Sequence, residues 1–244
     1  MAERTSVILG ATSTLGQAVA RELAVRGEAL TLVARDEDRL QRVAADLATR
    51  GTTVTRHVAS FEDPDTHEAL LETIGEADTW WFFWGTLPDQ SSCERDWTAA
   101  AAAIHANFTS VAAMLTRVAN RLERRGSGTI VVTSSVAGDR GRGSNYVYGS
   151  AKGGLSLFCQ GLRNRLAKRG VHLITVKPGF IDTSMTADVP KKPAVLWATP
   201  ERVACAMVRA RDRRRNTVYA PWFWHPIMLI IRSVPEHVFK RLSL

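Results

Sequence analysis

A tyrosine and a lysine, Tyr148 and Lys152, stand four residues apart in a segment with helical periodicity. Residues at this spacing are neighbours on one helix face, so we expect the phenol and the ammonium side by side. An isolated tyrosine has a pKa of about 10, and a neighbouring cation favours its phenolate. The pair therefore predicts acid–base catalysis by Tyr148. Tyr146 is the alternative neighbour, as a packing partner.

Two serines follow a strand upstream of this helix. The β-branched run from Thr129 to Thr133 leads directly into Ser134 and Ser135. Ligands of open α/β sheets bind outside the carboxyl ends of the strands. A serine at this edge is therefore placed to reach the same ligand as the tyrosine, and the strand alone does not choose between the two.

A loop with a glycine at each end joins the first predicted strand, Ser6 to Leu9, to a helix from Gly16 to Arg26. Such a loop lets the backbone approach a pyrophosphate, while the helix N-terminus offers free N–H groups and the positive end of its dipole. We therefore predict a dinucleotide-binding loop. Its cofactor-binding residues are Gly10, Thr12, Ser13, Thr14, Leu15 and Gly16.

The second predicted strand ends at Ala34 and Arg35. A cofactor with a free ribose 2′-hydroxyl usually meets an acidic residue near this point. The guanidinium of Arg35 suits a 2′-phosphate instead, which favours NADP(H) over NAD(H). The alternative is that Arg35 only solvates the loop, and the neighbouring Asp36 complicates the assignment.

These features together resemble the classical short-chain dehydrogenases/reductases over nearly the whole chain. The likeness includes Asn107, the thirteen-residue spacing from Ser135 to Tyr148, and the run from Lys177 to Thr183. It implies that Tyr148 protonates a carbonyl oxygen to which Ser135 also hydrogen-bonds. It also implies that Lys152 holds the nicotinamide ribose and lowers the pKa of Tyr148, and that Asn107 anchors a proton-relaying water. The further cofactor contacts that it implies are Gly85, Tyr148, Lys152, Pro178, Gly179, Ile181 and Thr183.

Three positions depart from the family pattern. Thr14 replaces the middle glycine of the loop, which is tolerable if the backbone there keeps a negative φ. The usual Asn-Ala-Gly after the fourth strand is Trp84-Gly85-Thr86, and the acidic residue expected after the third strand is absent from Val58-Ala59-Ser60. The adenosine side of the site is therefore expected to differ. The aromatic run from Trp80 to Trp84 is interpreted as core packing.

The elements that position these residues alternate between strand and helix. Strands are predicted at 6–9, 30–33, 54–58, 79–84, 129–133, 171–176 and 217–220, and helices at 16–26, 40–47, 65–74, 94–124, 145–168 and 200–211. Apolar strands alternating with helices indicate a parallel sheet covered on both faces. We predict an α/β fold: a single doubly wound Rossmann-type domain over residues 1–244, with 221–244 as a short helical extension.

Composition narrows the class of protein. With 45% hydrophobic and 23% charged residues, the chain of 244 residues is globular rather than disordered. Cys93, Cys159 and Cys205 are expected as buried thiols in a reducing compartment, and the six histidines lack ligand spacing, so no metal is expected. Neither a signal peptide nor a spanning segment is expected, which predicts a cytoplasmic location.

The net charge of +8 is concentrated near the C-terminus. Residues 201–244 hold nine Lys and Arg against three Asp and Glu, a net +6. This favours an anionic partner. The basic residues form no groove-reading motif, so a nucleic acid is not expected.

The C-terminal segment interleaves aromatic, aliphatic and basic residues from Trp222 to Leu242, in two short helical pieces separated by Pro235. It could lie at the inner face of a membrane as a peripheral contact, or pack on the substrate cleft or on another subunit. Together with Tyr219-Ala220-Pro221, this ending resembles the decaprenylphosphoryl-2-keto-erythro-pentose reductases within the family.

That likeness implies NADPH-dependent reduction of a lipid-linked, polyprenyl-phosphate keto-sugar, with the arginines Arg211, Arg213, Arg214 and Arg215 near its phosphate. The alternatives are a reductase of 3-ketoacyl or other soluble apolar ketones, and a non-catalytic NADP(H)-binding regulator. The family likeness also implies a homodimer or homotetramer, formed through the helices that hold Asn107 and Tyr148.

Overall fold

The computed structural model describes residues 4–187, 189 and 193–242. Its centre is a parallel sheet of seven strands in the order β3-β2-β1-β4-β5-β6-β9. The strands are β1 (Thr5–Leu9), β2 (Ala29–Ala34), β3 (Val54–Val58), β4 (Thr79–Phe82), β5 (Gly128–Thr133), β6 (Val171–Pro178) and β9 (Thr217–Ala220). The predicted doubly wound α/β fold is confirmed.

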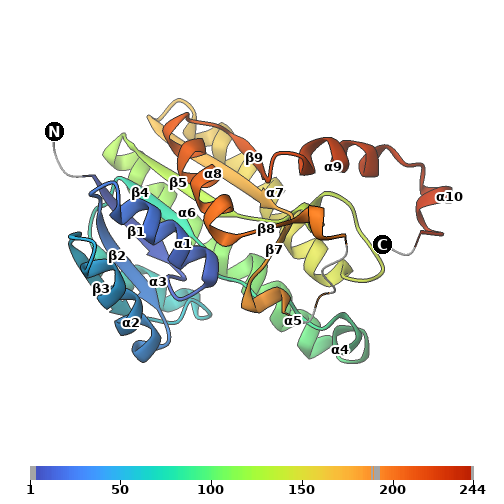
Figure 1. Ribbon diagram of the computed structural model, residues 1–244, viewed down its shortest axis with the longest axis horizontal. Coiled ribbons are helices and arrows are strands. Elements are labelled where there is room, and N and C mark those ends of the chain that lie inside the picture. The colour runs from blue at the N-terminus through green and yellow to red at the C-terminus, as the bar shows by residue number, and fades with distance from the viewer. Residues whose placement is uncertain (1–3, 188, 190–192, 243–244) are drawn as a thin grey trace.

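Helices cover both faces of the sheet (Figure 1). The buried faces of α1 (Thr14–Ala24), α2 (Glu37–Ala48) and α8 (Pro200–Asp212) share one apolar core with the sheet. The second core is formed with α3 (His67–Ile74), α6 (Ser110–Arg125) and α7 (Tyr146–Leu166). Central strand residues such as Ile8, Trp81 and Val131 are fully buried, which is why these strands are largely apolar.

The prediction of one continuous helix from Glu94 to Arg124 is wrong. The chain forms α4 (Gln90–Arg95) and α5 (Trp97–Ile104), then a π-helical turn (His105–Thr109) before α6. Asp96 causes the first break, because its carboxylate accepts a hydrogen bond of 2.8 Å from the N–H of Thr98 and caps α5.

The combined run Trp97–Arg125 has the length and mean hydropathy of a membrane span. Within α6, however, Val111, Met114, Leu115, Val118 and Leu122 are buried against the sheet. This packing identifies α6 as a core helix. No other helix in the described ranges reaches that length and hydropathy.

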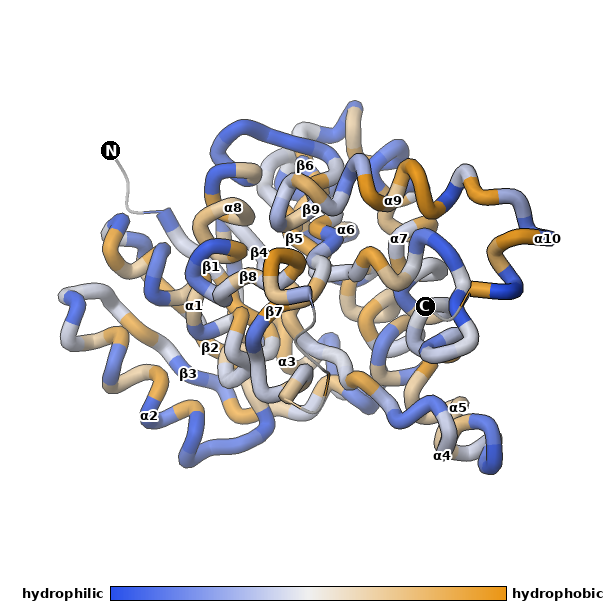
Figure 2. Tube along the Cα trace, turned by 45° about the vertical axis from the view of Figure 1, so that its right-hand side comes forward, coloured by the Kyte–Doolittle hydropathy of each residue, from blue (hydrophilic) through white to orange (hydrophobic). Residues whose placement is uncertain are grey.

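Two small features lie at the carboxyl edge of the sheet. A two-stranded ladder pairs β7 (Phe180–Ile181) with β8 (Trp197–Ala198). Beyond β9 the chain forms α9 (Trp224–Ser233) and α10 (Glu236–Phe239), and Pro235 separates the two helices as predicted. These two helices project from the body of the protein, and α9 carries apolar residues along its length (Figures 1 and 2).

Candidate active site

Ser135 and Tyr148 meet at the carboxyl edge of the sheet. Ser135 follows β5 in an extended conformation, and its hydroxyl accepts a hydrogen bond of 3.1 Å from the N–H of Ala137. The same hydroxyl is hydrogen-bonded to the phenol of Tyr148. Ser134 is buried instead, and its hydroxyl bonds to the carbonyl of Lys152 at 3.0 Å and to the hydroxyl of Ser156 at 2.8 Å. The structure therefore points Ser135, rather than Ser134, at the tyrosine.

Lys152 lies one helical turn after Tyr148 and is 4% exposed. Its Nζ is 5.8 Å from the centroid of the Tyr148 ring and 3.5 Å from the carbonyl oxygen of Thr133. Burial lowers the pKa of Lys152 to about 8. The ammonium of Lys152 lies close to the phenol of Tyr148 and to the end of β5, so it can interact with both the tyrosine and a bound ligand.

Burial also raises the pKa of Tyr148, and the hydrogen bond from Ser135 only opposes this rise. The net pKa of Tyr148 is therefore raised, and the lowering of this pKa by Lys152 stays a prediction. The physical reason is that withdrawal from water penalises the phenolate more than the hydrogen bond favours it. The phenol is held protonated, ready to donate a proton.

Asn107 lies in the π-helical turn and is fully buried. Its amide donates to the carbonyl of Ala103 at 2.9 Å, and its Oδ1 accepts from the N–H of Thr86 at 3.2 Å. Gly85 has a φ of +144°, and a Cβ there would lie 2.6 Å from Oδ1 of Asn107. Glycine is therefore required at 85 by the approach of Asn107, and the two residues predicted from different motifs are brought together.

The glycine loop has the expected geometry. Gly10 has a φ of +86°, and a Cβ on Gly16 would lie 2.7 Å from the carbonyl oxygen of Gly10. Ser13 caps α1, because its hydroxyl accepts from the N–H of Gly16 at 3.0 Å. Thr14 begins α1 and is not among the residues with positive φ, so its replacement of glycine brings no strain. Leu15 packs into the core instead of facing the loop's cavity.

A cavity of about 410 Å³ opens beside this loop, a volume in the range of small-molecule sites. Its lining includes Gly10, Thr12, Ser13, Arg35, Gly85 and Ser184. The cavity thus extends from the glycine loop to Ser184, next to the predicted cofactor contact Thr183. Arg35 is exposed and pairs with Glu62 at 3.2 Å. The donor set of backbone N–H groups, hydroxyls and guanidinium fits a phosphorylated dinucleotide.

Sequence reasoning missed two features of this cavity. Arg39, on the first turn of α2, also lines it and donates to the carbonyl of Thr12 at 3.1 Å. Trp84 stacks on Phe61, with centroids 4.3 Å apart and planes at 12°, in place of the expected polar residues. Trp80, Trp81, Phe82 and Phe83 are core residues as predicted, but Trp84 lies in the cavity wall. The strand ends at Phe82, which frees Trp84 from the sheet.

The run from Pro178 to Thr183 follows β6 directly. A Cβ on Gly179 would lie 1.9 Å from Nε1 of Trp224, so the indole covers this glycine. Ile181 is buried in the core, whereas the hydroxyl of Thr183 lies 3.3 Å from that of Thr186, one residue from the cavity-lining Ser184. Pro178 pairs with Ala220 of β9. These residues lie at the strand end, but the side chain of Ile181 points away from the cavity.

Comparison with known proteins decides the family. Residues 4–194 match the short chain dehydrogenase family. The chain is a short-chain dehydrogenase/reductase. It is 38% identical over 242 residues to an uncharacterized oxidoreductase of Mycobacterium tuberculosis, covering 97% of this chain and 96% of that protein. It is 30% identical over 190 residues to the 3-oxoacyl-acyl-carrier-protein reductase FabG of Escherichia coli, covering 75% of each chain.

The fold comparison agrees. A short-chain dehydrogenase from Sphingobium yanoikuyae, solved in complex with NADPH, superposes with a TM-score of 0.82 at 24% identity, covering 96% of this chain and 97% of that one. The oxidoreductase family and the Rossmann-type architecture of this short-chain dehydrogenase/reductase are thus established together.

The C-terminal extension of this reductase packs on the catalytic loop. Trp224 and Met228 are buried against Val136, the residue after Ser135. Arg140 fastens the extension: it donates to the carbonyls of Arg232 at 3.0 Å and Val234 at 2.8 Å, and lies over the ring of Phe239 at 4.1 Å. The extension therefore packs against the loop after β5, and the predicted covering of the substrate cleft stays a prediction. The residues that hold the extension in place are too distant in sequence from one another to be predicted from local patterns.

The arginine cluster predicted near a substrate phosphate lies elsewhere. Arg211 is 5% exposed and pairs with the buried Glu28 at 2.7 Å. Arg213, Arg214 and Arg215 follow the end of α8 and precede β9, which places them at the amino edge of the parallel sheet. The prediction is wrong, because the cleft lies at the opposite edge.

The cysteines largely match their predicted burial. Cys93 and Cys159 are buried as predicted, but Cys205 is only half-buried. Burial raises the pKa of the Cys159 thiol to about 12, so it remains a thiol. Within the described residues, no group of three or more His, Cys, Asp or Glu side chains is arranged to hold a metal.

Proposed function

We propose that this enzyme reduces a ketone to a secondary alcohol with NADPH. The observation that carries the proposal is the approach of the Ser135 hydroxyl to the phenol of Tyr148, with the buried Lys152 one helical turn further along α7. The nicotinamide supplies the hydride when bound. Tyr148 donates a proton to the carbonyl oxygen, and Ser135 stabilises the charge that develops there. Lys152 holds the ribose, and Asn107 anchors the water that returns a proton.

The preference for NADPH over NADH rests on two cations at the cavity. Arg35 and Arg39 both line it, at the end of β2 and the start of α2. A 2′-phosphate accepts hydrogen bonds from such guanidinium groups. The NADPH complex of the Sphingobium yanoikuyae relative supports this cofactor.

We propose a lipid-linked, polyprenyl-phosphate keto-sugar as the substrate. The support is the apolar wall of Val136, Trp224 and Met228 beside the catalytic loop, together with the resemblance of the C-terminal ending to the keto-pentose reductases. A 3-ketoacyl thioester is the second candidate, favoured by the similarity to FabG. The same apolar wall would accept an acyl chain.

A cytoplasmic enzyme that acts on lipid-linked substrate must reach a membrane surface. Trp222, Leu229 and Ile230 expose 74%, 50% and 69% of their surface beside Arg232. We propose that the extension contacts the inner face of an anionic membrane peripherally. We also propose a homodimer or homotetramer through α6 and α7, where Leu157 is 69% exposed.

The test is NADPH oxidation by the purified protein with a panel of polyprenyl-phosphate keto-pentoses in detergent and 3-ketoacyl thioesters. Faster turnover of the keto-pentoses supports the first substrate. Turnover of only the thioesters selects the second. If NADPH binds but no ketone is reduced, the chain is a non-catalytic NADP(H)-binding regulator.

A further inference from the structure

A cluster of charged groups lies behind the catalytic loop. Asp139, four residues after Ser135, accepts hydrogen bonds from Nζ of Lys177 at 2.5 Å and from the hydroxyl of Tyr219 at 2.7 Å. Both of its oxygens are therefore occupied. The Lys177 and Asp139 side chains expose only 9% and 3% of their surface. We call Asp139, Arg142, Lys177, Tyr219 and Arg232 the Asp139 cluster.

The cluster carries more positive than negative charge. Asp139 contributes one carboxylate, while Lys177, Arg142 and Arg232 contribute three cations. Arg232 lies close enough to Tyr219 to oppose the rise in the pKa of that phenol. Because the surroundings are partly withdrawn from water, this excess is screened less than it would be on an open surface. The cluster therefore attracts an anion.

Arg142 is the cation of this cluster with an unfilled hydrogen-bonding capacity. Within the described residues its guanidinium makes one hydrogen bond, from Nη2 to the thioether of Met228 at 3.6 Å, and a thioether is a weak acceptor. Asp139 acts on it only through space, and desolvation lowers the pKa of Arg142. A half-buried guanidinium without a carboxylate partner is electrostatically unsatisfied.

The position of Arg142 ties it to the substrate. It lies on the loop between Ser135 and Tyr148, at the carboxyl edge of the sheet. Its backbone carbonyl accepts from the N–H of Asn145, three residues before Tyr148. Arg140, two residues earlier, is held by the end of α9. Arg142 is thus carried on an anchored segment beside the catalytic pair, and it does not line the dinucleotide cavity.

We propose that Arg142 forms a subsite for an anionic group of the substrate, either a phosphate or a carboxylate. Its planar fork donates two parallel hydrogen bonds to such a group, and Lys177 and Arg232 add positive potential behind it. This subsite rests on the proposed ketone reductase function, because it orients the ketone toward Tyr148.

The binding test does not depend on turnover. The full chain is first saturated with NADPH, so that the cofactor's own phosphate sites are filled. Inorganic phosphate, octyl phosphate and octanoate are then titrated by calorimetry into wild type, Arg142→Gln and Arg142→Lys. Arg213→Gln removes an exposed arginine at the opposite edge and is the matched control.

We expect Arg142→Gln to weaken octyl phosphate or octanoate binding by at least about tenfold, and Arg142→Lys to weaken it less. Arg213→Gln should bind as wild type does. Tighter binding of octyl phosphate than of octanoate assigns the subsite to phosphate, and the reverse assigns it to carboxylate. Equal affinity of wild type and Arg142→Gln for all three probes, or no binding by wild type, overturns the subsite.

Kinetics separate this proposal from the proposed function. A ketone is compared with its analogue that lacks the anionic group, and Arg142→Gln should raise KM only for the anionic ketone. If ketones are reduced but Arg142→Gln changes neither binding nor KM, the subsite is wrong and the reductase function stands. If no ketone is reduced while the probes bind through Arg142, the reductase function is wrong.

Discussion

The indole of Trp224 lies directly against Gly179, so closely that a Cβ on the glycine would be 1.9 Å from Nε1. Trp224 is 4% exposed, and its Nε1 has no hydrogen-bond partner among the described residues. One contact therefore joins the C-terminal extension to the run after β6, which holds the predicted cofactor contacts. The extension forms part of the active-site wall.

Gly179→Ala should disturb catalysis through this contact. The added methyl displaces the indole, and Trp224 cannot move without shifting α9 from Val136. We expect kcat/KM to fall by about tenfold or more, as misplacement of a site wall commonly does. Steady-state kinetics with NADPH check this. Gly143→Ala is the control, because nothing lies within 4 Å of a Cβ there; equal losses in both variants would contradict the wall contact.

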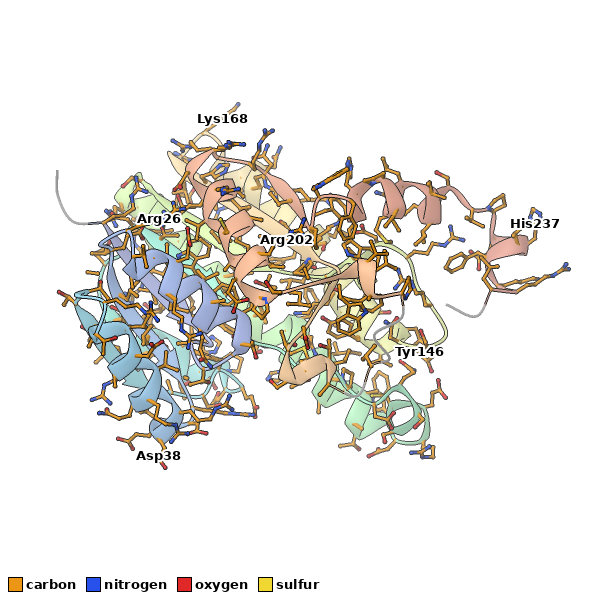
Figure 3. All side chains as sticks on the ribbon, in the orientation of Figure 1. Arg26, Asp38, Tyr146, Lys168, Arg202 and His237 are labelled. Carbon is orange, nitrogen blue, oxygen red and sulfur yellow. The ribbon has the colours of Figure 1, made fainter. Side chains whose placement is uncertain are left out.

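Tyr148→Phe removes the proton donor while leaving the ring. We expect kcat to fall by about 100-fold to 10,000-fold, the range for loss of a general acid. NADPH affinity, measured by fluorescence titration, should change little. Tyr146→Phe serves as the control, since Tyr146 is 44% exposed and lies at the surface at the start of α7 (Figure 3). Retained activity in Tyr148→Phe would exclude the proposed chemistry.

Lys152 should make folding stability depend on pH. Burial lowers its pKa from 10.5 to about 8 in the folded chain. Between these values the unfolded chain binds more protons, so the free energy of unfolding rises with pH. Below pH 8 Lys152 is protonated in both the folded and the unfolded chain, so it no longer makes the free energy of unfolding depend on pH.

The comparison uses urea unfolding of wild type and Lys152→Met at pH 7.5 and 9.5. Wild type should gain stability relative to the variant, with a limiting slope of about 1.4 kcal/mol per pH unit. Both proteins carry Cys159→Ala, because the ammonium of Lys152 opposes the rise in the thiol pKa of Cys159 and that effect would not cancel. Parallel pH profiles would show that Lys152 keeps its ordinary pKa.

Arg39→Gln should weaken NADPH binding by about tenfold through loss of a charge-assisted hydrogen bond. NADH has no 2′-phosphate, so its affinity should stay the same. Arg42→Gln, an exposed neighbour on the same helix, controls for the change in helix charge. Equal weakening of NADPH and NADH in fluorescence titrations would remove Arg39 from 2′-phosphate recognition.

The double variant Leu229→Ser/Ile230→Ser tests the membrane contact. Each side chain withdrawn from the interface should weaken binding to anionic vesicles by about tenfold. Val25→Ser, an exposed apolar site at the end of α1, is the control. Vesicle co-sedimentation of all three proteins gives the answer, and unchanged pelleting of the double variant would end the proposal.

Local pattern predicts the sheet well but not the interruptions of its helices. The strands β3 and β9 match their predicted limits, although both are edge strands with partly exposed side chains. The break at Asp96 depends on a single cap, and the π-helical turn at Asn107 leaves no mark in the periodicity. The two-residue strands β7 and β8 are too short to carry a pattern.

The proximity of Ser135, Tyr148 and Lys152 could be predicted because their spacing along the chain is fixed by one strand end and one helix. The surroundings depend on contacts between distant residues. Arg211 looked like a surface phosphate ligand, yet Glu28, far away in sequence, buries it in an ion pair. Trp84 packs against the core as predicted, but its stacking partner Phe61, in the loop after β3, could not be predicted from local sequence.

The contacts of Arg140 couple the loop after β5 to the extension. The extension lies beyond the main body, with His237 at its far end and Lys168 on a distant part of the surface (Figure 3). Among the described residues of the extension only Pro221, Trp224, Met228 and Phe239 are buried, so it has no core of its own. Its amide protons should therefore exchange with solvent whenever the segment carrying Arg140 detaches. Entry of the proposed ketone past the loop that carries Arg140, and detachment of the extension from that loop, are then a single conformational equilibrium.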